Sequence, residues 1–178
     1  MKNLFAIFIT LSLLSTSIYA QVWKPNVEDS LELSVAQAII KANESDPTLT
    51  KWFESAYAYA VFPKVGKGGL IVGGAHGKGL VIRGDTTMGT TSLSQVTVGA
   101  QIGGQVYAQY IMFKDETAFS HFTRGNYEMG AQASAVAVTL GASADARYDS
   151  GVAVFTLADG GLMLEASIGG QKFKYTSK

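Results

Sequence analysis

Five residues near the middle of the chain have the types and spacing to bind an anionic ligand beside an apolar surface. Phe62, Lys64 and Lys67 lie close together, and Lys78 and Arg83 follow on the next glycine-punctuated segment. If these segments form neighbouring hairpins, the basic side chains gather at the hairpin mouths. Cations beside an apolar rim suit anionic lipid head groups or acidic polymers. The five are therefore the candidate ligand-binding residues, and the alternative is that these lysines only keep strand ends soluble.

The glycine-rich stretch around these lysines resembles a nucleotide-binding loop only superficially. A P-loop requires a glycine five residues before its Gly-Lys pair and a hydroxyl residue after that pair. Around Gly77-Lys78 those two places are taken by Val72 and Gly79. The stretch also lacks the third glycine of the dinucleotide fingerprint. The sequence therefore predicts glycine-rich strand ends and hairpin turns here, with no cofactor.

Neither catalytic nor metal-binding residues are predicted. The two histidines, His76 and His121, are too far apart in sequence to pair on one helix face. The chain has no cysteine, which excludes thiol catalysis, disulfides and cysteine-ligated metal. It also lacks a Gly-x-Ser-x-Gly nucleophile motif, and salt bridging explains Asp145 and Asp149 beside Arg147. We expect a protein that is not an enzyme, although a triad of distant residues stays open.

The N-terminal residues predict export. Lys2 precedes an almost wholly apolar run from Leu4 to Leu14, and small residues lead to Ala20. This order is typical of a secretory signal peptide, assigned to residues 1–20, with one domain at 21–178. No cysteine near the junction can accept a lipid, so a periplasmic or envelope-associated protein without a lipid anchor is expected. The net charge is zero, which does not favour nucleic acid as a partner.

Two helices are predicted before the strands begin. Apolar residues recur at helical spacing over residues 27–42, and Asp46 with Pro47 ends this helix and can start a second. The polar side of the first helix carries Glu28, Asp29 and Glu32, so it should repel an anionic surface.

The rest of the chain alternates apolar and polar residues between glycines, which indicates short strands and turns. The first strand is expected to end at Pro63. Further strands are predicted at residues 69–73, 79–83, 92–102, 105–113, 130–140, 146–157 and 161–168, with a short helix inserted at 114–123. Ala131, Ala133, Ala135 and Ala137 make one face of a strand small, which lines either a pocket or a packed core. The expected fold is α+β, with a curved antiparallel, barrel-like sheet, two N-terminal helices and one inserted short helix.

The order of several short motifs resembles the SYLF domain family. They are Val61-Phe62-Pro63, Lys67-Gly68-Gly69, Gly77-Lys78-Gly79, the Gly99 to Gln105 series, Ile111-Met112-Phe113, Gly130-Ala131, Gly161-Leu162 and Gly169-Gly170. The resemblance covers the chain from about Ser34 onward. It implies an α+β lipid-binding module without catalytic residues, associated in eukaryotes with phosphoinositide membranes and actin. Actin is not expected as a partner of an exported bacterial protein.

Two functional hypotheses remain from the sequence. The first is an exported binding module that contacts a phospholipid or membrane surface through the five residues named above. The second is a structural or protein-interaction module that self-associates, or binds a protein partner, through a sheet edge. An outer-membrane barrel is disfavoured by the helices and by strands shorter than the roughly 9–11 residues that such barrels need.

Overall fold

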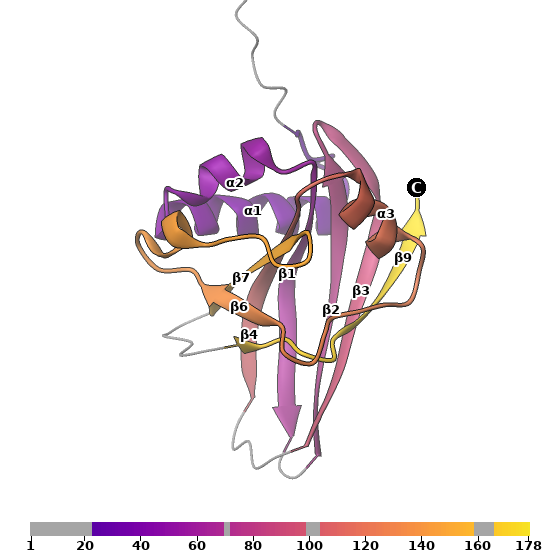
Figure 1. The fold of residues 1–178 in the computed structure, drawn as a ribbon. Helices are drawn as coiled ribbons and strands as arrows, with labels where there is room; N and C mark the ends of the chain where they lie inside the picture. The colour runs from indigo at the N-terminus through magenta and orange to yellow at the C-terminus, as the bar shows by residue number, and fades with distance from the viewer. Residues whose placement is uncertain (1–22, 70–71, 99–103, 159–165) are drawn as a thin grey trace, which may run out of the picture.

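The structure is a computed structural model that describes residues 23–69, 72–98, 104–158 and 166–178. It has three α-helices and one curled, mostly antiparallel sheet, so the predicted α+β class is confirmed (Figure 1). The predicted signal peptide lies outside the described residues, as does most of the strand predicted at 161–168.

The sheet has the strand order β5-β9-β3-β2-β1-β4-β7-β6-β8. Its long central strands are β1 (Ala58–Gly69), β2 (Val72–Arg83), β3 (Thr86–Val98) and β4 (Gln105–Phe113). The remaining strands are β5 (Tyr127–Glu128), β6 (Ser134–Ala137), β7 (Val152–Ala158), β8 (Ala166–Ser167) and β9 (Lys172–Ser177). All described pairings are antiparallel except that of β6 with β7. The C-terminal strand β9 thus lies between β5 and β3, whereas β8, which precedes it in sequence, lies at the other end of the strand order.

The sheet buries side chains on both faces because successive strand residues point to opposite sides. One face, called here the α1 face, carries Tyr59, Val61, Leu80 and Ile82 and packs against α1 (Ser30–Ser45) and α2 (Leu49–Ser55). The other, called the α3 face, carries Phe62, Val65, Leu93 and Phe173 and packs against Phe119 and Phe122 of α3 (Glu116–Thr123). Figure 1 shows that α1 and α2 lie near one end of the long strands, and that β1, β2 and β3 continue well beyond them.

A carboxylate fixes each end of α1: Asp29 caps its start, and the buried Asp46 lies at its end. At its start, the Asp29 side chain accepts hydrogen bonds from the N–H groups of Leu31 and Glu32, at 2.8 and 3.1 Å, so α1 begins three residues later than the sequence predicts. At its end, Asp46 is fully buried. Its carboxylate accepts hydrogen bonds from the N–H groups of Thr48, Gly141 and Ser143, at 3.0, 3.1 and 2.8 Å.

Two local predictions were wrong. Pro63 does not end a strand but lies within β1, at a bulge where the register with β2 shifts between Val61 and Lys64; a bulge tolerates proline because it lacks one ladder bond. Of the strand predicted at 130–140, only Ser134–Ala137 forms.

The prediction of glycine-rich strand ends is confirmed in part. Gly68, Gly69, Gly73 and Gly74 lie at the adjoining ends of β1 and β2, whereas Gly77 and Gly79 lie inside β2.

Close backbone approach explains two of the strand glycines. A Cβ atom on Gly79 would collide with the Val61 carbonyl oxygen beside the β1 bulge, and one on Gly89 would collide with the Thr176 carbonyl oxygen. The alanines of the small-residue segment contribute to packing as well, since Ala133 and Ala135 lie against the core of the α3 face. In the described residues the small face therefore belongs at least in part to a packed core.

Candidate anion-binding face

The five residues predicted to bind a ligand do not form one patch. Phe62 is fully buried in the α3 face, where its ring lies 5.7 Å from that of Phe173. Lys67 shares the register position of Ala75, a core residue of the α3 face. Arg83 lies at the far end of β2, with its guanidinium 4.3 Å from the centre of the Tyr57 ring.

Lys64 and Lys78, in contrast, are direct cross-strand neighbours. They occupy opposite positions in the β1–β2 pair, and both are exposed. Lys78 lies two residues from Leu80 of the α1 face, which places it on that face. Lys64 lines a pocket there together with residues of α1. The structure thus brings together two of the five predicted residues.

The register extends this pair into a row across four strands. Lys78 is opposite Ser92 of β3, and Ser92 is opposite Lys174 of β9. Lys174 follows Phe173 of the α3 face, so its side chain belongs to the α1 face. We call Lys64, Lys78, Ser92 and Lys174 the lysine row. With strands about 4.8 Å apart, the row spans about 15 Å of the sheet surface.

The next row toward the free ends of the strands adds a fourth lysine and an apolar residue. It runs from Lys172 through Ser94 and His76 to Gly66 and Val106. Val106 is 43% exposed, and Val96, further along β3 opposite Gly74, is 78% exposed. Because each residue advances a strand by about 3.3 Å, Val106 lies about 7 Å and Val96 about 13 Å beyond the lysine row. Exposed valines therefore border the basic row on one side.

The charge of this face is poorly compensated. Among the described residues, ion pairs join Lys172 to Glu128 at 3.7 Å and Lys178 to Glu32 at 3.5 Å. Neither pair includes Lys64, Lys78 or Lys174, whose exposed ammonium groups therefore remain available to an external anion.

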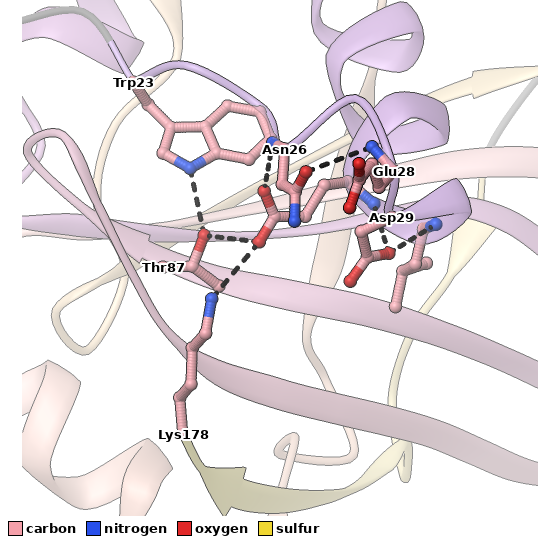
Figure 2. Close-up of polar contacts among 8 residues, drawn as sticks. Trp23, Asn26, Glu28, Asp29, Thr87 and Lys178 are labelled. Carbon is pink, nitrogen blue, oxygen red and sulfur yellow. Dashed lines mark hydrogen bonds and ion pairs between the residues drawn. The ribbon is translucent and has the colours of Figure 1, made fainter.

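Of the three acidic residues expected on the polar side of the first helix, Glu28 and Asp29 are exposed just before α1, but Glu32 is buried. Glu32 is only 4% exposed. Figure 2 labels Trp23, Asn26, Thr87 and Lys178, which form the network of polar contacts around it. One of its oxygens accepts a hydrogen bond from the Asn26 N–H at 2.6 Å, and the other accepts one from the Thr87 hydroxyl at 3.2 Å and pairs with Lys178. The Trp23 indole N–H in turn donates to the Thr87 hydroxyl at 3.0 Å. Glu32 thus joins the segment before α1 to β3 and to the C-terminal residue, and its charge is neutralised inside the fold.

Among the described residues, no three side chains of His, Cys, Asp or Glu are placed to share a metal ion. No helix in this part of the chain is long and apolar enough to cross a bilayer.

Sequence reasoning missed the contribution of the C-terminal strand. The alternation Lys172-Phe173-Lys174-Tyr175 is the signal that could have revealed it, because it places both lysines on the face opposite Phe173. Its place beside β3, however, is a long-range pairing that alternation alone does not predict.

Within the part of the chain that the structure describes, the molecule is a curled α+β domain whose sheet carries a row of lysines without ion-pair partners. The family model described as "Ysc84: Las17-binding protein actin regulator" matches residues 94–177. Residues 94–177 therefore match the Ysc84 (SYLF) family, and this match confirms the resemblance seen in the sequence. This is a family of non-catalytic binding domains. The match includes β9 with Lys172 and Lys174 but begins after β2, so Lys64 and Lys78 lie outside it.

A curated relative extends the similarity toward the N-terminus. A protein of Aeromonas veronii named "Beta cell expansion factor A" is 31% identical over 137 residues, which are 76% of this chain and 52% of that protein. The chain therefore spans about half the length of this relative.

Proposed function

We propose that this protein is a binding module that attaches peripherally to membranes containing anionic lipid, through the lysine row and the valines beside it. The observation that carries the proposal is the row itself: three exposed lysines from three strands share one surface and have no ion-pair partner among the described residues. Each lysine near an anionic membrane surface contributes about 1 kcal/mol of attraction.

The arrangement of charge and apolar surface supports the same proposal. Peripheral proteins bury apolar groups roughly 5–10 Å into the boundary between head groups and acyl chains. With the free ends of the strands directed toward the bilayer, Val106, about 7 Å beyond the lysine row along the strand direction, would reach that boundary. Lysine stems are long enough to keep their ammonium groups at the head groups while the valines lie deeper. The basic row and its apolar border thus match the two layers of a membrane surface.

Vesicle sedimentation tests this proposal. The wild type should sediment with phosphatidylcholine vesicles that contain about one-third phosphatidylglycerol, and added salt should release it because salt screens the attraction. Replacing Lys64, Lys78 and Lys174 together by Gln should weaken binding about 100-fold, since three attractions of about 1 kcal/mol are lost.

A control variant with the same net charge tests whether binding depends on the lysine row or only on the total charge. Lys51→Gln, Lys67→Gln and Lys114→Gln together remove the same charge from positions outside the lysine row, and this variant should sediment nearly as well as wild type. Equal loss of binding in both variants would show that the row has no special role. Membrane attachment through charge would be contradicted if the wild type binds neutral and anionic vesicles equally well. It would also be contradicted if the wild type binds neither kind.

We also propose that the protein acts after export, in the periplasm or at the cell envelope. The support is the signal-like order of residues 1–20, which is independent of the basic face. Mass spectrometry of the protein from the native host should give an N-terminus at Gln21. A chain recovered with residues 1–20 intact would oppose export by this route.

A further inference from the structure

A pocket of about 130 Å³ lies on the α1 face, where α1 passes over β1, β4 and β7. Ala108, Tyr110 and Leu157 from the sheet give it an apolar floor. Lys41 from α1 and Lys64 from β1 line it as well. The pocket therefore combines an apolar surface with ammonium groups that come from two separate elements.

The charge of this pocket favours an anionic occupant. Neither Lys41 nor Lys64 takes part in an ion pair among the described residues, and none of the described lining residues is Asp or Glu. Two cations that line one small pocket repel each other, and an anion between them replaces this repulsion by two attractions. A phosphomonoester carries a charge of about −1.5 to −2 at neutral pH, which matches two ammonium groups better than a carboxylate does.

The walls of the pocket are held in place before any ligand binds. The Tyr110 hydroxyl donates a hydrogen bond of 2.8 Å to the carbonyl oxygen of Ala38, about one turn before Lys41. Burial raises the pKa of Tyr110 above its usual value, so this hydroxyl stays protonated and remains a donor. The Glu32 and Asp46 contacts fix the two ends of α1. A preformed wall lowers the entropic cost of binding.

We infer that this pocket binds the phosphomonoester group of a small amphiphilic ligand. Lys41 and Lys64 hold the phosphate, and the carbon skeleton of the ligand lies on Ala108 and Leu157. This site extends the proposed function and rests on it in part, because Lys64 also belongs to the lysine row. A lipid with a terminal phosphate and a soluble phosphate ester both supply this chemistry.

Titration with two phosphate probes tests the site and separates these sources. The probes are sn-glycerol 3-phosphate and dihexanoyl phosphatidic acid, with dihexanoyl phosphatidylcholine as the diester control. Binding is followed by calorimetry and by the methyl NMR signals of Ala38 and Ala108. Lys41→Gln should weaken binding of the phosphate probes about tenfold, the effect of losing one charge-assisted hydrogen bond. Ala108→Leu, which fills the floor, should weaken it at least as much, whereas Lys51→Gln on α2 should leave it unchanged.

Each outcome bears on the inference. Tighter binding of the phosphatidic acid analogue assigns the pocket to a lipid, and equal binding of both probes assigns it to a soluble ester. The inference is overturned if neither probe binds, or if Lys41→Gln and Ala108→Leu both retain wild-type affinity.

A further variant tests membrane attachment through the lysine row independently of this pocket. Lys78→Gln with Lys174→Gln changes the lysine row outside the pocket, so this variant should lose vesicle binding and keep its affinity for the soluble ester. Loss of vesicle binding only in the pocket variants would instead overturn the role of the row.

Discussion

The Asp46 carboxylate links two parts of the chain that are far apart in sequence. Burial alone would raise the pKa of this group, but hydrogen bonds from Thr48 and Ser143 outweigh burial and hold the pKa well below its usual range. The ionised form is therefore favoured in the folded state, and its hydrogen bonds join the end of α1 to the segment at 141–143. Asp46 thereby contributes to stability only while it is ionised.

The first prediction at this scale concerns acid. A carboxyl group with a lowered folded-state pKa stabilises the fold above its unfolded pKa of about 3.9, and this contribution is lost as pH falls toward the folded value. Asp46→Asn should cost about 2 kcal/mol at pH 7, because hydrogen bonds to a charged group are lost. Urea unfolding at several pH values should show that stability declines less steeply below about pH 4 in the variant. Parallel curves for the two proteins would contradict this role.

The second prediction concerns Gly79. An added methyl group would meet the backbone of β1 at Val61, so Gly79→Ala should lower the free energy of unfolding by about 1–3 kcal/mol. Gly68 provides the control within the same strand pair, because no heavy atom lies within 4 Å of a Cβ placed there. Thermal unfolding should therefore separate the two variants. Similar melting temperatures for both would show that the β1 bulge can adjust.

At the scale of elements, α1 depends on a contact far away in sequence. Thr87→Val removes the hydroxyl that donates to Glu32 and accepts from Trp23. We expect a loss of about 2 kcal/mol, since two hydrogen bonds disappear and Glu32 stays buried. Hydrogen exchange should accelerate most in α1. Thr90→Val on the same strand, where the side chain is exposed, is the control and should leave α1 exchange unchanged.

The elements that local pattern determines were predicted well. Helical spacing gave α1 and α3, and alternation gave β4 with its bounds at Gln105–Phe113. Prediction failed where tertiary contacts override local preference. Pro63 was expected to end a strand, but it lies at a bulge in β1, where the register with the neighbouring strands shifts. Gly79 was expected at a strand end or turn but lies inside β2, where close contact with the Val61 carbonyl oxygen leaves no room for a side chain.

At the scale of the whole molecule, the sequence predicted that five residues gather on one surface. The structure places two of them, Lys64 and Lys78, opposite each other in the β1–β2 pair. The bulge at Pro63 shifts the register by one residue, which sets the side on which Lys64 lies, and no local signal reports such a shift. Glu32 was misjudged for a similar reason, because its partners come from β3 and from the C-terminus.

Strand β9 is the last strand of the described chain, and its pairing with β3 completes the lysine row. An incomplete chain that stops before Lys172 already contains Lys64 and Lys78 but lacks the strand that completes the row. Under the proposed membrane attachment, a chain without β9 should bind anionic vesicles more weakly than the full chain, because one of the three lysines of the row is missing. Completion of the binding surface would then depend on the last strand to be synthesised.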